Sequence, residues 1–305
     1  MLRPKIWLGL TDWVAFKFGQ FFLHLAAISR CWPLRHMTEP RVERVGTRYR
    51  LTSIEGVSIE ALRIARFDQP NRARNQPYSG AGMKLPIVFA HGWLETKEFH
   101  LREAELLARH GHDVILFDMR RHGCSTGKCV TFGVKEKHDV VAVIDNAQRR
   151  GWVGNRVITM GFSLGAATML QHATIDQRVA AVVALAPFYN LTEAIRSFHR
   201  AHKAPIRLSF VQRAFELAFR RYAMDIRQAS PIDEVRRTEV PVLLAVGQRD
   251  NLLPDAQHTR RLAEAKIHGR CYYVQIPDAG HMDFCCRQWP GRDEAILDFC
   301  CQVSK

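Results

Sequence analysis

Three residues that lie far apart in the chain have the types and positions of a nucleophilic catalytic unit. Ser163 stands at the centre of Gly-Phe-Ser-Leu-Gly, between an apolar run and a helical pattern. The two glycines allow a tight turn from strand to helix, which would lift the serine hydroxyl above a sheet. A serine hydroxyl is a weak nucleophile unless a base takes its proton. The sequence must therefore also supply a histidine and an acid that orients it.

Asp250 and His281 follow Ser163 in the order that such a turn requires, namely serine, acid and histidine. Asp250 comes just after the strand predicted at residues 240–246, and His281 comes after the strand predicted at residues 271–276. We therefore predict that Ser163 is the nucleophile, that Asp250 is the acid, and that His281, in a loop, is the base.

Two other acidic residues compete with Asp250. Asp278 precedes the histidine so closely that its carboxylate would orient the imidazole ring with difficulty. Asp255 falls at a predicted helix start, where aspartate is a common capping residue. His91 also follows a predicted strand and is a second candidate for the base, but we interpret it as a structural residue of its loop.

A tetrahedral intermediate needs hydrogen-bond donors for its oxyanion, each contributing about 3–4 kcal/mol. One donor should be the backbone N–H of Leu164, which directly follows the nucleophile at a helix start. The other should come from the loop after the strand predicted at residues 85–90, which reads His91-Gly92-Trp93. We assign it to the backbone N–H of Trp93.

Apolar runs that alternate with helical patterns predict the elements that carry these loops. Such continuous runs are typical of a parallel sheet covered by helices on both faces. The expected strands are residues 48–53, 58–67, 85–90, 113–118, 156–160, 179–186, 240–246 and 271–276, and the expected helices are residues 98–110, 134–150, 164–173, 254–266 and 291–301.

About fifty residues without a strand interrupt this alternation after residue 187. An insertion at this place lies beyond the carboxyl ends of the strands, where ligands bind, so we interpret it as a cap. The expected division is an amphipathic N-terminal helical segment at residues 1–40, a core at 41–188 and 238–305, and a helical cap at 189–237. Several aromatic residues of the cap either line an acyl pocket or pack the cap onto the body: Phe198, Phe210, Phe215, Phe219 and Tyr222.

The chain resembles the α/β-hydrolase fold, in particular the cap-bearing serine hydrolases of esterase and lipase type. The resemblance is carried by VFAHGW (88–93), FDMRRHGCSTG (117–127), GFSLG (161–165), SPIDEV (230–235), PVLLAVGQRDNLLP (241–254) and PDAGH (277–281). It implies a triad of Ser163, Asp250 and His281, with no metal and no cofactor. It also implies that residues 118–123 form a structural loop whose charges have no catalytic role.

These observations lead to one main hypothesis, a serine hydrolase that cleaves an ester, thioester or related acyl bond of a small molecule or lipid through an acyl-enzyme. An acyltransferase that uses the same triad is the first alternative. A catalytically silent binding protein of the same fold is the second. The complete set of triad residues argues against the silent protein, because silent relatives are expected to lose triad members.

The net charge of +14 is concentrated in two segments of the sequence. Residues 1–50 hold nine basic and three acidic side chains, and residues 189–237 hold ten and five. Such charge favours anionic partners. The sequence contains no recognition helix, zinc finger or RNA-binding aromatic strand, so we expect no nucleic-acid partner. The segment GCSTGK (123–128) has neither the spacing nor the final Ser/Thr of a phosphate-binding loop.

Residues 6–28 are rich in large apolar side chains but are interrupted by Asp12, Lys17, Gln20 and His24. These four residues fall within one arc of a helical wheel. We therefore expect an amphipathic helix that lies in the interface of an anionic membrane. The alternatives are a helix packed on the protein's own body, a dimer contact or a single membrane span.

The eight cysteines do not have the spacing of a zinc site, and two pairs are adjacent in sequence. We expect buried, reduced thiols, which are typical of a reducing compartment. The N-terminal segment also lacks the features of a convincing signal peptide. We therefore expect a cytoplasmic protein, peripheral on the membrane.

Overall fold

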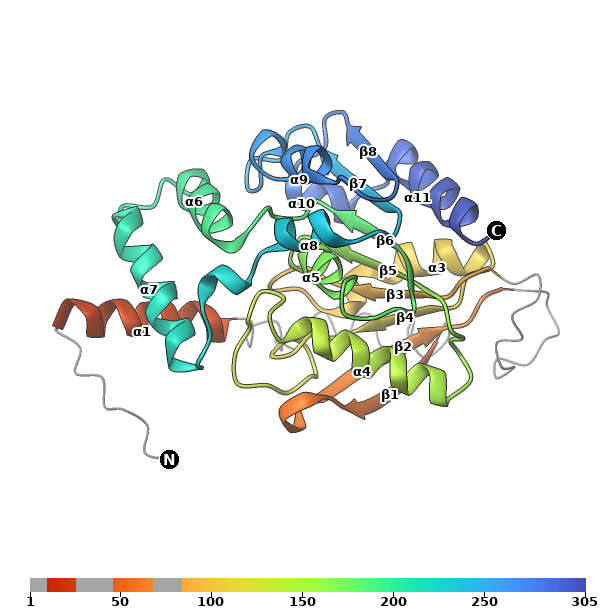
Figure 1. The fold of residues 1–305 in the computed structure, drawn as a ribbon, viewed down its shortest axis with the longest axis horizontal. Coiled ribbons are helices and arrows are strands. Elements are labelled where there is room, and N and C mark those ends of the chain that lie inside the picture. Colours follow the sequence, from red (N-terminus) through yellow and green to blue (C-terminus); the bar gives the residue numbers. More distant parts are fainter. Residues whose placement is uncertain (1–9, 26–45, 68–83) are drawn as a thin grey trace.

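The structure is a computed structural model that describes residues 10–25, 46–67 and 84–305. At its centre is an eight-stranded sheet with the order β1-β2-β4-β3-β5-β6-β7-β8 (Figure 1). The strands are β1 (Thr47–Thr52), β2 (Ser58–Ile64), β3 (Ile87–Ala90), β4 (Val114–Phe117), β5 (Val157–Phe162), β6 (Val179–Leu185), β7 (Val242–Gly247) and β8 (Cys271–Ile276). Strand β2 is antiparallel to both of its neighbours and all other pairs are parallel, which confirms the mostly parallel sheet.

Helices cover both faces of the sheet because successive strand residues point to opposite sides. In β3, Val88 and Ala90 join the apolar cluster that includes residues of α4 and α5. Their neighbours Ile87 and Phe89 join the cluster on the other side, which includes residues of α3 and α11. The covering helices are α3 (Leu101–Arg109), α4 (Glu136–Arg149), α5 (Leu164–His172), α9 (Thr259–Ala265), α10 (His281–Cys286) and α11 (Pro290–Val303).

Several predicted boundaries differ from those of the structure. Strand β2 stops at Ile64 rather than at residue 67, because its pairing with β4 ends where Ile64 faces Val114. The helix predicted at residues 254–266 is divided into a 3-10 turn, η5 (Asp255–Gln257), and α9, since the backbone of His258 between them is not helical. A similar turn, η3 (Lys97–His100), precedes α3.

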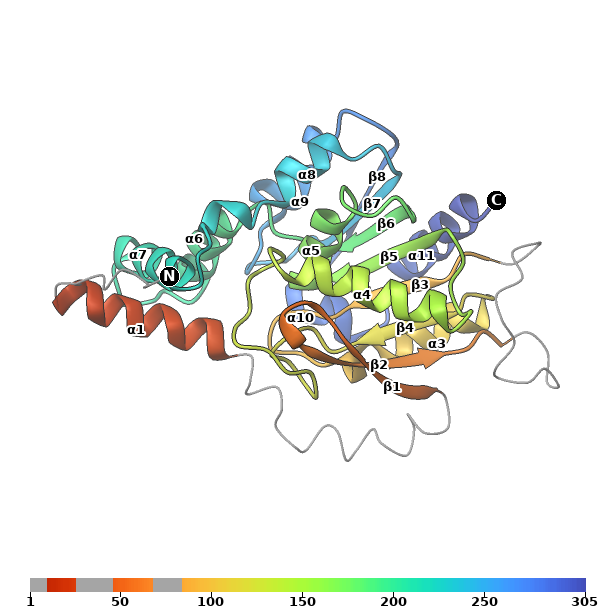
Figure 2. The ribbon, with the colours of Figure 1, turned by 60° about the horizontal axis from the view of Figure 1, so that its bottom comes forward.

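The segment between β6 and β7 forms two groups of helices rather than one. Helices α6 (Leu191–Ala201) and α7 (Leu208–Arg221) stand away from the sheet (Figures 1 and 2). A short turn, η4 (Ile226–Gln228), leads from them to α8 (Pro231–Arg237), which packs against α5 and α9 and buries Ile232 and Val235. By its contacts, α8 therefore belongs to the body, and α6 and α7 are the helices that project from it.

The N-terminal helix α1 (Leu10–Leu25) packs along α7, and Figure 2 shows the two side by side. Asp12 forms an ion pair with Arg213 at 3.1 Å near one end, and the imidazole of His24 lies 3.0 Å from the Tyr222 hydroxyl near the other. A Cβ atom added to Gly19 would lie 2.0 Å from the carbonyl oxygen of Ala214, so the two helices touch at backbone level.

Of the arrangements considered for the N-terminal segment, the structure therefore has α1 on the protein's own cap. In the described part of the chain, no helix combines the length and apolarity needed to cross a membrane. The rest of the segment expected at residues 1–40 lies outside the described residues.

The cysteines fit the expectation of buried thiols only in part. Cys129 and Cys300 are buried free thiols, whereas Cys271, at the start of the edge strand β8, is exposed.

We predict that Gly19→Ala lowers the melting temperature of the protein. In an exposed helix this change would stabilise by about 1 kcal/mol, because alanine has the higher helix propensity. Here the added methyl group meets the Ala214 carbonyl, and overpacking of this kind costs about 1–3 kcal/mol. Thermal unfolding measures whether the melting temperature falls or rises. Lys17→Ala, on the exposed side of α1, is the control. A higher melting temperature for Gly19→Ala would contradict the packing of α1 on α7.

Candidate active site

Ser163 occupies a strained turn between β5 and α5. Its backbone has φ 51° and ψ −111°, a conformation that L-residues rarely adopt and that costs about 1–3 kcal/mol. The Ser163 N–H donates to the carbonyl oxygen of Leu185 in β6 at 2.8 Å, which fixes the turn to the sheet. Ser163 is half-buried at the carboxyl end of β5.

The glycines on either side of the serine are required by close approach of the backbone. A Cβ atom on Gly161 would lie 2.3 Å from the carbonyl carbon of Gly165. A Cβ atom on Gly165 would lie 2.1 Å from the carbonyl oxygen of Ala90, at the end of β3. Helix α5 can therefore begin directly against β3 only with glycine at these positions.

The structure brings together the three residues that the sequence predicts as a triad. The Oγ of Ser163 lies 3.1 Å from Nε2 of His281, and Nδ1 of His281 lies 2.6 Å from Oδ2 of Asp250. Both His281 and Asp250 are buried. His281 is the first residue of α10 rather than a loop residue, which corrects the predicted location. The ring of Phe162 packs against its imidazole, with ring centroids 5.1 Å apart.

The loops that carry the acid and the histidine are fastened to each other. The Arg249 N–H donates to the carbonyl oxygen of Ala279 at 2.9 Å, and a Cβ atom on Gly247 would lie 2.3 Å from that same oxygen. The second carboxylate oxygen of Asp250 accepts the backbone N–H groups of Leu252 and Leu253 at 3.0 and 2.8 Å. These contacts fix the Asp250 carboxylate relative to the imidazole.

The competing acids lie elsewhere. Asp278 is exposed and forms an ion pair with Arg249 at 2.5 Å. Asp255 is buried, and its carboxylate accepts the hydroxyl of Tyr273 at 2.6 Å and the side chain of Arg260 at 3.1 Å. Asp250 is therefore the acid that contacts the histidine.

The expected oxyanion donors lie next to the nucleophile turn. Because α5 begins against the end of β3, Leu164 is close to the loop that starts at His91. The N–H of Gly92 is occupied by the carboxylate of Glu95 at 2.7 Å. Within the described ranges, the N–H groups of Trp93 and Leu164 donate to no protein group. These two donors therefore remain available for an oxygen atom of a substrate.

His91 is held neutral inside its loop. Its Nε2 accepts the N–H of Met119 at 3.0 Å, so the proton is on Nδ1, which donates to the carbonyl of Gly92 at 2.7 Å. Burial lowers the pKa of His91 to about 4. Because both ring nitrogens have hydrogen-bond partners in the protein, His91 stabilises the loop and neither nitrogen is available to act as a base.

A further histidine, His258, connects the body to the helices that project from it. It accepts the N–H of Tyr189 at 3.1 Å through Nδ1, and its Nε2 donates to the Oγ of Ser197 in α6 at 2.9 Å. Burial lowers the pKa of His258 to about 3, so this contact persists with a neutral ring. Neither His258 nor Glu95 lies in a sequence pattern that distinguishes it from a surface residue, so neither could be identified from the sequence.

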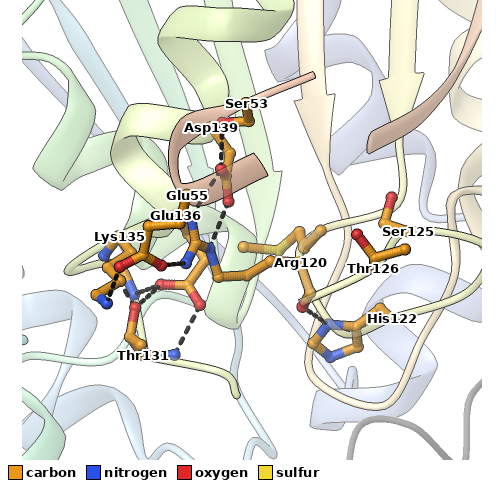
Figure 3. A network of polar contacts seen from close by, with 12 residues as sticks. Ser53, Glu55, Arg120, His122, Ser125, Thr126, Thr131, Lys135, Glu136 and Asp139 are labelled. Carbon is orange, nitrogen blue, oxygen red and sulfur yellow. Dashed lines mark hydrogen bonds and ion pairs between the residues drawn. The ribbon is translucent and has the colours of Figure 1, made fainter. Parts of the chain in front are cut away.

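The loop after β4 is held by buried charges that do not reach the triad. Figure 3 shows the guanidinium of Arg120, which donates to Asp139 of α4 at 2.6 and 2.8 Å. The same carboxylate accepts the hydroxyl of Ser53 at 2.5 Å. Glu136 accepts the backbone N–H of Thr131 at 2.7 Å nearby. All these carboxylates have partners in the protein, as befits a structural loop.

One group in the described part of the chain has the composition of a metal site: Glu60, Asp118 and Cys124. The ammonium group of Lys97 already lies between the two carboxylates, 3.0 Å from Glu60 and 2.8 Å from Asp118. Burial by itself lowers the pKa of Lys97. The neighbouring carboxylates of Asp118, Glu98 and Glu60 raise the pKa by more than burial lowers it, so the amine stays charged. The lysine thus takes the position that a cation would occupy.

Comparison with known proteins agrees with this fold. Residues 87–286 match the Alpha/beta hydrolase family. The chain belongs to the alpha/beta hydrolase family. Over 238 residues this hydrolase-family chain is 28% identical to the uncharacterized protein YqkD of Bacillus subtilis (strain 168), and the match covers 75% of this chain and 70% of that protein.

Solved structures of hydrolases share the architecture. The Pyrococcus furiosus esterase Pf2001 superposes with a TM-score of 0.65 at 19% identity, covering 90% of this chain and 97% of that one. A thermophilic esterase from Thermogutta terrifontis gives a TM-score of 0.59 at 18% identity, covering 85% and 100%. A puromycin-hydrolyzing peptidase of Mycobacterium tuberculosis gives 0.63 at 20% identity, covering 85% of this chain but 39% of its own. At these identities the likeness concerns the fold.

Proposed function

We propose that this alpha/beta hydrolase is a serine hydrolase that cleaves a carboxylic ester, a thioester or a related acyl bond. The observation that carries the proposal is the hydrogen-bonded chain from Ser163 through His281 to Asp250, at 3.1 and 2.6 Å. A hydroxyl, an imidazole and a buried carboxylate in this order are the parts that nucleophilic acyl chemistry requires.

In the proposed reaction, the Oγ of Ser163 attacks the substrate carbonyl while Nε2 of His281 takes the hydroxyl proton. Asp250 accepts the hydrogen bond from Nδ1, keeps the ring in this tautomer and stabilises the imidazolium that forms. The intermediate collapses when His281 gives its proton to the leaving oxygen or sulfur, and the acyl group stays on Ser163. Water, activated by the same histidine, then releases the acid.

The charge on the tetrahedral intermediate falls on the former carbonyl oxygen. We propose that the N–H groups of Trp93 and Leu164 bind this oxyanion, since neither has another acceptor in the described residues. Each such donor contributes about 3–4 kcal/mol to the stability of the transition state.

The Asp250→Asn variant should lose about 10⁴ in kcat toward a short p-nitrophenyl ester, because an amide leaves the imidazole in the wrong tautomer. Asp278→Asn is the matched control, since this exposed acid forms an ion pair with Arg249 and not with His281. Its rate should stay within about threefold of the wild type. Comparable losses in the two variants, or a fully active Asp250→Asn, would refute the proposed acid.

We also propose that the protein binds an anionic membrane surface through the outward side of α1. Trp13, Val14 and Phe21 are 51%, 45% and 59% exposed there, and the exposed Lys17 lies among them. Aromatic side chains beside a cation suit the boundary between lipid headgroups and acyl chains. The contact is peripheral, because the opposite side of α1 is packed on α7.

The double variant Trp13→Ser/Phe21→Ser should float with phosphatidylglycerol vesicles about tenfold less well than the wild type, because it lacks both aromatic rings proposed to enter the membrane interface. Phe67→Ser removes an aromatic ring of similar exposure, 52%, three residues after β2 and should not change flotation. Equal recovery of wild type and double variant, or equal binding to neutral phosphatidylcholine vesicles, would count against the proposal.

A further inference from the structure

The partly buried side chain of Trp93 contacts phenylalanine rings from three separate parts of the chain. Phe22 of α1 stacks on the indole with ring centroids 6.3 Å apart. Phe132, from the loop before α4, and Phe198 of α6 each lie 6.0 Å from it, centroid to centroid. Trp93 is therefore a point at which the N-terminal helix, the cap and the body meet.

Further rings lie behind this first group. Phe215 of α7 lies 5.7 Å from Phe22 and 6.1 Å from Phe132, and Phe18 lies 5.0 Å from Phe22. Aromatic rings at these separations are in van der Waals contact. Since Phe132 and Phe215 are also buried, the rings fill the space beyond the indole.

The N-terminal helix is fixed in this position by contacts with both of its neighbours. Its Leu23 is fully buried, and the carbonyl of Leu23 accepts the N–H of Val130 from the body at 3.0 Å. On the other side, Gly19 lies against the backbone of α7 at Ala214. These contacts fix the backbone that carries Phe22 on both sides.

The position of Trp93 relates these rings to the substrate. In the proposed reaction, the carbonyl oxygen lies at the Trp93 N–H and the leaving oxygen faces His281, which protonates it. Leu164, which carries the other proposed donor, belongs to the apolar cluster against which Trp93 and Phe22 pack, so an acyl chain that enters this cluster runs along the Trp93 indole. An apolar acyl chain that extends past the indole meets the ring of Phe22.

We propose that Phe22 of α1 is a specificity-determining residue that ends the acyl-binding region and limits the substrate to short acyl groups. This inference rests on the proposed function. It assigns to the N-terminal helix, which lies outside the residues matched by the family, one wall of the active site.

The test compares kcat/KM for p-nitrophenyl octanoate and p-nitrophenyl acetate in Phe22→Ala. Removing the ring makes room for methylenes beyond the indole, and each newly buried methylene favours binding about fourfold. The octanoate-to-acetate ratio should therefore rise about tenfold over the wild type, with a smaller rise in Phe22→Leu. Both esters have the same leaving group and are measured on one preparation, so the folded fraction cancels from the ratio.

Phe67→Ala is the control, because it removes the same ring from an exposed position outside α1. Its ratio should equal that of the wild type. An unchanged or lower ratio in Phe22→Ala, or an equal rise in Phe67→Ala, would overturn the assignment of Phe22 while leaving the proposed function intact. A wild-type protein that hydrolyses neither ester would instead remove the proposed function, and this inference with it.

Discussion

The positive φ of Ser163 is the constraint from which the arrangement of the site follows. A parallel strand in the middle of a sheet can pass directly into a covering helix only through a sharp turn, and this turn costs about 1–3 kcal/mol of backbone strain. Burial of β5 between β3 and β6 offsets that cost, and glycines at 161 and 165 let the backbones approach. The turn places the hydroxyl at the carboxyl edge of the sheet. The loops after β7 and β8, fastened to each other, deliver the acid and the histidine to the same edge.

The uneven charge of the sequence has a structural counterpart. The two segments that hold most of the excess positive charge include α1 and the helices α6 and α7, and in the structure α1 packs on α7. One side of α1 presents aromatic residues to solvent, and the other contributes Phe22 to the rings around Trp93. The N-terminal helix thus contributes residues both to the proposed membrane contact and to the proposed acyl site, although it lies outside the residues that match the family.

The sequence predicted those parts of the site that depend on strand ends. Ser163, Asp250 and His281 each follow an apolar run, and parallel strands bring their carboxyl ends to one edge whatever the details of packing. What it did not predict depends on contacts between distant side chains. The packing of α1 on α7 rests on the fit of Gly19 to Ala214, and the link between His258 and Ser197 joins residues 61 positions apart. The sequence also did not predict α10, which has only six residues and therefore shows little periodicity. Nor did it predict that α8 lies apart from α6 and α7, because local periodicity does not indicate which part of the protein a short helix contacts.

If Ser163 is a nucleophile activated by His281, its Oγ should form a covalent bond to a fluorophosphonate probe. One probe molecule should react per folded chain, the adduct should lie on the peptide containing Ser163, and labelling should disappear in Ser163→Ala. Ser209→Ala, which changes an exposed serine of α7, should be labelled normally. Undiminished labelling of Ser163→Ala, or no labelling of the folded wild-type protein, would show that Ser163 is not the activated nucleophile.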